Sequence, residues 1–107
     1  MTKVIPLEIQ FSEGSDYKVT STIQLFNKKG NKRYLNGQFS EALRFYLKAL
    51  KLFPEIGIIH FNAALCFLSL KKTPKAKKHF YLAKKFSGGN KKILESEFTK
   101  KFARGHF

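Results

Sequence analysis

The sequence has few of the residues on which catalytic and metal sites depend. It contains one cysteine, Cys66, and only seven acidic side chains in 107 residues. A single cysteine excludes an internal disulfide and a cysteine-based metal site, and it favours a reducing compartment such as the cytoplasm. The sequence has no HExxH motif and no Cys–His or paired-carboxylate spacing. We therefore expect a non-catalytic protein that has no metal or cofactor.

Long apolar runs are also missing. A membrane-spanning helix needs about 18 or more consecutive apolar residues, and no stretch approaches that length, so we predict no transmembrane segment. The apolar fraction of 43% is nevertheless too high for a disordered tail. We expect one folded domain with a modest core.

Positive charge is the feature that the sequence has in excess. The formal net charge is +14, and such a field attracts nucleic acid, anionic lipid or acidic protein segments. Phenylalanine, isoleucine and asparagine are abundant as well, so the lysines also have a plainer explanation as the filling of solvated faces in a chain of biased composition. Composition alone leaves both explanations open.

The apolar pattern changes along the chain from extended to helical. Residues 4–11, VIPLEIQF, alternate apolar and polar side chains, which predicts a partly extended arm within residues 1–19. Helical spacing follows, and Ser21 with Gln24 fits a capping box at the start of the first helix. We predict five antiparallel helices and almost no strand.

Two helical hairpins superpose when the chain is shifted by 34 residues. Small residues fall on small ones and aromatic residues on aromatic ones: Gly30 on Ala64, Ala42 on Ala76, Tyr46 on Phe80 and Ala49 on Ala83. This period, with helix–turn–helix units, is the signature of the tetratricopeptide repeat. The segment GNKRYLNGQFSEALRFYLKALKLFP resembles the core of such a repeat, and Pro54 ends it. The second copy departs from the pattern because Lys71 replaces the turn glycine, Gly37.

The resemblance implies an all-α fold, a right-handed helical solenoid. One repeat is expected at about residues 22–55, a second at about 56–89 and a capping helix at about 91–104, all within a domain spanning 20–104. Solenoids of this type usually need about three repeats for stability. The arm, a dimer or a neighbouring domain is therefore expected to complete the core.

The resemblance also implies where a ligand binds. In this family the first helix of each hairpin lines a concave face that binds an extended peptide, which makes the protein an adaptor or scaffold. We expect the bound segment to be acidic and partly apolar. The face maps onto nine residues: Asn27, Asn31, Tyr34, Ile58, Phe61, Asn62, Leu65, Leu68 and Lys92.

One subgroup of the family uses this face to grip the C-terminal carboxylate of chaperone tails. Asn31, Asn62 and Lys92 match three positions of that carboxylate clamp. The match fails at Asn27, where the clamp has lysine, and at Ser96, where it has arginine. Charge-assisted hydrogen bonds hold such a carboxylate, and here only one cation remains.

Three occupants of the apolar strip in the groove stay open: a partner protein, a second copy of the chain, or the arm itself. Glu8, Glu13 and Asp16 make the arm acidic as well as apolar, whereas residues 56–94 contain nine lysines and no acid. An acidic, apolar arm beside a basic, apolar groove is a candidate internal ligand.

A second cluster of lysines, which we call the basic face, is predicted on the outer side of the second hairpin. Its functional interpretation is the binding of nucleic acid or an anionic surface, and its structural interpretation is a solvated convex face. The chain has only three arginines and no glycine-rich phosphate loop, which favours the solvated face. The residues are Lys71, Lys72, Lys75, Lys77, Lys78, Lys84 and Lys85.

Overall fold

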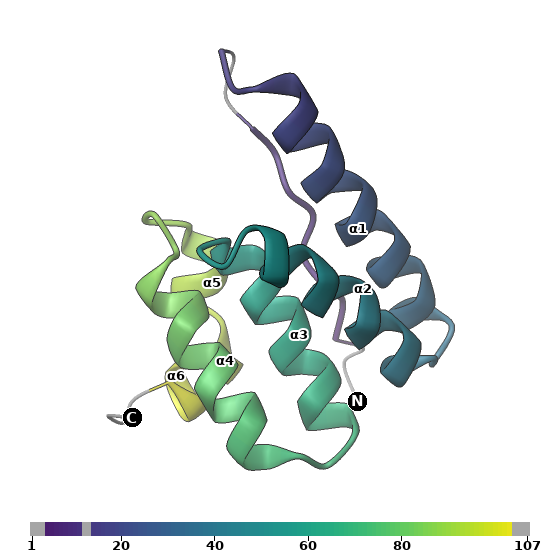
Figure 1. Cartoon of the computed structure of the whole chain (residues 1–107). Helices are drawn as coiled ribbons and strands as arrows, with labels where there is room; N and C mark the ends of the chain where they lie inside the picture. Colours follow the sequence, from purple (N-terminus) through teal and green to yellow (C-terminus); the bar gives the residue numbers. More distant parts are fainter. Residues whose placement is uncertain (1–3, 12–13, 104–107) are drawn as a thin grey trace.

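The computed structural model describes residues 4–11 and 14–103, and helices are the only regular secondary structure within those residues. Consecutive helices pack side by side as two hairpins, followed by two short helices at the C-terminal end (Figure 1). This is the predicted all-α helical-repeat fold. The helices are α1 Tyr17–Leu35, α2 Phe39–Leu52, α3 Gly57–Ser69, α4 Thr73–Lys85, α5 Lys91–Leu94 and α6 Glu97–Phe102.

Helix α1 begins one turn earlier than the sequence pattern predicted. Asp16 is the N-cap, and its carboxylate accepts a hydrogen bond from the backbone N–H of Val19 at 3.1 Å. An N-cap carboxylate satisfies a free N–H and also interacts favourably with the helix dipole. The predicted capping box at Ser21 is therefore wrong, and Tyr17 to Val19 belong to the helix rather than to the arm.

Both hairpins turn with the same backbone conformation. Gly37 has φ 77° in the first turn, and Lys71, its equivalent in the second, has φ 60°. This left-handed region is open to glycine but strained for a residue with a Cβ atom. The second turn therefore keeps the geometry of the first even though the residue suited to it has been replaced.

Helices α1 and α2 approach closely at Gly30. A Cβ atom added there would lie 2.4 Å from Cε1 of Tyr46, a fully buried ring of α2. The second hairpin has Ala64 and Phe80 at these places, and both are fully buried. The repeated small-and-aromatic pairs thus occupy the core in both hairpins.

The C-terminal segment differs from the predicted single helix at 91–104. Asn90 caps α5, as its side chain accepts from the backbone N–H of Lys92, but that helix ends after one turn. Ser96 then caps α6 by accepting from the N–H of Phe98. A serine that bonds the backbone locally competes with helix continuation. The chain turns at this point, and Phe98 stacks on Phe80 of α4 with the ring centroids 6.1 Å apart.

Candidate functional site

The arm runs between α1 and α3, on the side of the hairpins that was predicted to be concave (Figure 1). Most of the hydrogen bonds that hold it there are made by the backbone of one residue, Leu7. The N–H of Leu7 donates to Oδ1 of Asn62 at 2.7 Å. Its carbonyl oxygen accepts from Nδ2 of Asn62 at 2.9 Å, Asn27 at 3.0 Å and Asn31 at 3.2 Å. Three asparagines from two hairpins therefore converge on the backbone N–H and C=O of one residue.

The asparagines are also bonded to one another, so their amide groups have defined orientations. Asn62 donates to Oδ1 of Asn27 at 2.8 Å, and the hydroxyl of Tyr46 donates to Oδ1 of Asn31. The side chains are almost fully buried, with exposed fractions of 1% for Asn27, 5% for Asn31 and 0% for Asn62. Burial in this network raises the pKa of the Tyr46 hydroxyl, mainly by desolvation. Buried amides that satisfy one another in this way form a rigid binding surface.

The side chains of the arm alternate as the sequence predicted. Leu7, Ile9 and Phe11 are partly buried against the core, whereas Glu8 and Gln10 are exposed. The carbonyl oxygen of Ile9 accepts a long hydrogen bond, 3.5 Å, from the side chain of Gln24. The arm is therefore bound as an extended peptide would be, with its backbone on amides and alternate side chains on apolar surface.

The remaining residues that were mapped to the concave face divide into two groups. Tyr34, Phe61 and Leu65 are buried, and Phe61 lies edge-on to Phe80 with the ring centroids 5.6 Å apart, so it belongs to the core of the second hairpin. Ile58 and Leu68 are half-buried and Lys92 is exposed. The open part of the face is consequently smaller and more polar than the sequence indicated.

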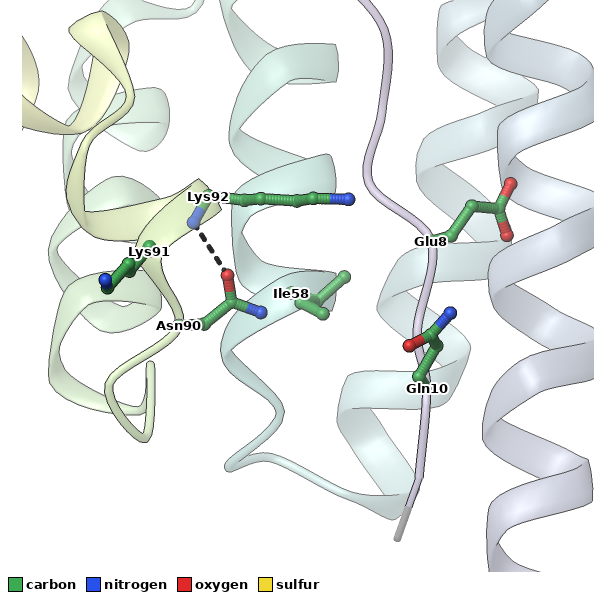
Figure 2. A pocket seen from close by; sticks show the side chains of 6 residues that line it. All are labelled: Glu8, Gln10, Ile58, Asn90, Lys91 and Lys92. Atoms are coloured by element: carbon green, nitrogen blue, oxygen red, sulfur yellow. Dashed lines mark hydrogen bonds between the residues drawn. The ribbon is translucent and has the colours of Figure 1, made fainter.

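A cleft of about 370 Å³ lies beside the docked arm (Figure 2). Lys92 extends from α5 across the front of α3 toward the arm, whereas the side chain of Glu8 turns away from α5 (Figure 2). The cleft thus presents cationic groups next to the backbone of the arm. Its lining residues are Glu8, Gln10, Ile58, Asn90, Lys91 and Lys92.

The first hairpin matches a known protein family. Residues 23–56 match the family model of the tetratricopeptide repeat. This segment is similar to a tetratricopeptide repeat. Comparisons of the chain with curated proteins and with solved structures found no match. The second hairpin, α3 and α4, repeats the architecture of the matched one, so the chain has a helical-repeat fold of the tetratricopeptide kind.

The second hairpin contains a pair of histidines in place of two phenylalanines of the first repeat. His60 stands where the first repeat has Phe26, and His79 where it has Phe45. Nδ1 of His60 lies 3.0 Å from Nδ1 of His79, and Nε2 of His60 lies 2.7 Å from the carbonyl oxygen of Pro54. A carbonyl only accepts, so Nε2 of His60 must carry a hydrogen and its Nδ1 must accept from His79.

Burial disfavours the charged form of both histidines. The pKa of His79 is lowered to about 4, mainly by desolvation and also by the nearby His60 and Lys78. Desolvation also lowers the pKa of His60, against the opposing effect of its bond to Pro54. The rings of His60 and His79 are also stacked, with a centroid distance of 5.2 Å, so the pair contributes to packing of the second hairpin.

Cys66, the one cysteine of the sequence, is buried in α3. Burial raises the pKa of the Cys66 thiol to about 12, which keeps it protonated and unreactive. Within residues 4–11 and 14–103, no three His, Cys, Asp or Glu side chains are grouped to hold a metal ion. No helix in the described part of the chain is long and apolar enough to cross a membrane.

The basic face is exposed at all seven predicted lysines. Its ammonium groups also contact rings of the second hairpin: Nζ of Lys75 lies 5.8 Å from the ring centroid of Phe67, and Nζ of Lys85 lies 5.4 Å from that of Phe86. Lysine stems that cover apolar rings in this way are ordinary at a solvated surface. Binding of an anionic partner to this face stays a prediction.

Proposed function

We propose that this protein is a non-catalytic adaptor whose concave face binds an extended segment of a partner protein. Tetratricopeptide repeats are typically modules of protein–protein interaction, and residues 23–56 are similar to such a repeat. The observation that carries the proposal is the clamp on Leu7, in which Asn27, Asn31 and Asn62 hold both backbone groups of an extended segment.

The clamp favours a ligand class rather than one sequence. Any residue of a bound segment can make these backbone hydrogen bonds in place of Leu7, except proline, which has no N–H to donate to Asn62. Selectivity then comes from apolar side chains at alternate positions, as at Leu7 and Ile9 of the arm. Lys91 and Lys92 line the cleft beside the arm and make this side of the groove cationic, which favours a partner segment with a net negative charge. The partner segment is therefore expected to be acidic and partly apolar.

The arm occupies the place that the partner segment would take, so it acts as an internal competitor. A partner must displace it and must supply at least the same backbone bonds. Because arm and groove belong to one chain, the arm has a high effective concentration, and a free segment competes at a disadvantage. Weakening the arm without touching the groove should increase the affinity for a peptide added in trans.

The test uses a labelled synthetic peptide with the sequence of the arm, residues 1–13, and the full chain carrying Leu7→Asp and Ile9→Asp. Fluorescence anisotropy should show at least tenfold tighter peptide binding to this variant than to the wild type. Ile5→Asp is the matched control, because Ile5 is 61% exposed and its substitution leaves the docked arm in place. Adding Asn62→Ala to the double variant should abolish the gain.

Circular dichroism must first show that the double variant keeps its helices. If it does, and the peptide binds wild type, control and double variant equally or not at all, the concave face is not a peptide site and the proposal fails.

A further inference from the structure

The α1–α2 hairpin carries a second surface that the concave face does not use. Two adjoining clefts of about 180 and 320 Å³ lie between the two helices, and no residue of α3 lines either. Phe45 and Arg33 line both clefts, so the two are continuous. We call this surface the first-hairpin cleft, and its lining residues are Lys29, Lys32, Arg33, Glu41, Arg44, Phe45 and Lys48.

The cleft is strongly cationic. Five of its seven lining residues are lysine or arginine, and its one acid, Glu41, is already paired with Arg33 at 3.3 Å. Helix α1 contains no acidic residue. Two of the three arginines in the chain, Arg33 and Arg44, lie here, whereas the basic face has none. Arginine binds phosphate in a bidentate geometry that lysine cannot reproduce.

An aromatic ring lies at the centre of these charges. Phe45 is half-buried, and Nζ of Lys29 and Nζ of Lys48 each lie 5.9 Å from its ring centroid. A cationic groove with an aromatic ring is the arrangement that proteins use to hold single-stranded nucleic acid, with phosphates on the cations and a base stacked on the ring. A ring within a cleft does not project outward, so it is poorly placed to insert into a membrane.

We propose that the first-hairpin cleft binds single-stranded nucleic acid. A base stacks on Phe45, and the backbone phosphates on either side are bound by Lys29 and Lys32 of α1 and by Arg44 and Lys48 of α2. The carboxylates of an acidic peptide would bind the cations but would not stack on the ring. The recognition is of the polymer rather than of a base sequence, because stacking is available to every base.

The first experiment measures binding of a labelled oligouridylate of about 20 nucleotides, a length of the same order as known single-strand sites, by fluorescence anisotropy over a range of salt. Lys29→Gln with Lys48→Gln should weaken binding at least tenfold. Each phosphate contact contributes about 0.7 to the slope of log K against log salt for single strands, so this variant should lose about 1.4 of that slope. Lys77→Gln with Lys78→Gln is the matched control, because both side chains are exposed on α4 and the charge change is identical. The affinity of this control for the oligouridylate should fall less than threefold.

Phe45→Leu tests the stacked base separately from the charges. Leucine fills the same half-buried space, so the fold should be kept, as thermal unfolding will check. Because base stacking on an aromatic ring contributes about 1–3 kcal/mol, binding should fall at least fivefold while the salt slope stays unchanged.

Two results would overturn the proposal. If the α4 control loses as much affinity as Lys29→Gln with Lys48→Gln, binding follows the overall charge and there is no site. If polyglutamate or vesicles of anionic lipid bind as tightly as the oligonucleotide, or if Phe45→Leu binds the oligonucleotide like the wild type, the surface recognises charge and not nucleic acid.

Discussion

The two hairpins have the same shape and differ in polarity at equivalent positions. In the first, Asn31 and Tyr46 are bonded to each other; in the second, Leu65 and Phe80 stand at the same places. The exchange preserves the size and the burial of the side chains, which is what helix packing requires. It changes what the helices can hold, since Asn31 binds the backbone of the arm and Leu65 cannot. The repeat therefore preserves a packing arrangement, while the hydrogen bonds to the arm come from polar departures from it.

A second pair of equivalent positions differs in the opposite sense. Phe26 and Phe45 of the first hairpin correspond to His60 and His79 of the second. Beneath the arm the first hairpin supplies Asn27 and Asn31 and the second supplies Asn62. The second hairpin carries titratable rings where the first has phenylalanine. Substitutions at these positions can measure how much the stability of each hairpin depends on the residues in which the two hairpins differ.

The largest effect should come from Gly30→Ala. The new Cβ atom would lie 2.4 Å from the ring of Tyr46, and the bond from Tyr46 to Asn31 prevents that ring from moving away. Overpacking of this kind should reduce the free energy of unfolding by about 3 kcal/mol. The reverse change in the second hairpin, Ala64→Gly, should reduce it by only about 1 kcal/mol, as glycine does in a helix. Urea unfolding compares the two, and equal losses would mean that the close approach is not specific to the first hairpin.

The next effect concerns the polar cluster that joins the two hairpins to the arm. Asn62→Leu leaves the N–H of Leu7 and Oδ1 of Asn27 without their partner, and unsatisfied buried groups should cost about 2 kcal/mol. Hydrogen exchange at the amide of Leu7 should accelerate because the arm is released. Asn36→Ala, at an exposed turn, should change stability by less than about 0.5 kcal/mol. Unchanged exchange at Leu7 would argue against the clamp.

The histidine pair should make the second hairpin sensitive to acid. The pKa of His79 is about 4 in the folded chain and 6.5 when unperturbed, so below pH 6.5 the unfolded state binds protons that the folded state does not. Stability is therefore complete above pH 6.5 and declines as the pH falls toward 4. The loss should be on the order of 1–2 kcal/mol, a figure reduced for the partial exposure of His79.

Replacing the pair with the residues of the first hairpin isolates this effect. The variant His60→Phe with His79→Phe should lose less stability than the wild type between pH 6.5 and 4, as measured by urea unfolding at each pH. Carboxylates titrate in the same range, but they are common to both proteins and cancel in the difference. Identical pH profiles would show that the histidines do not control the response.

The smallest effect should come from the two turns. Lys71→Gly relieves the left-handed strain at φ 60° and should stabilise the protein by up to about 1 kcal/mol. Gly37→Ala in the first turn should destabilise it by about the same amount. Lys72→Gly serves as the control, because its φ of −103° places no demand for glycine. A gain from Lys72→Gly as large as that from Lys71→Gly would contradict the assignment of strain to position 71.

Local patterns in the sequence predicted the helices better than their ends. The repeat of small and aromatic residues indicated both hairpins, but the start of α1 and the break between α5 and α6 were missed. Ser21 and Asp16 are both good N-cap residues, so either could begin α1. Ser96 is compatible with the interior of a longer helix and with the N-cap of a new one. Such alternatives differ by about 1 kcal/mol, which packing elsewhere in the fold can decide.

The amino-acid sequence by itself determined the all-helical repeat fold, because the spacing of apolar and small residues specifies which faces of the helices pack. It also determined the alternation of the arm, which requires only a period of two. Only the tertiary structure decided what the asparagines bind, since Leu7 and Asn62 are 55 residues apart. It likewise decided that Phe61 and Leu65 are core rather than open groove, and that His60 meets His79. A side chain's type states which bonds it can make, but its partners depend on how the hairpins stack.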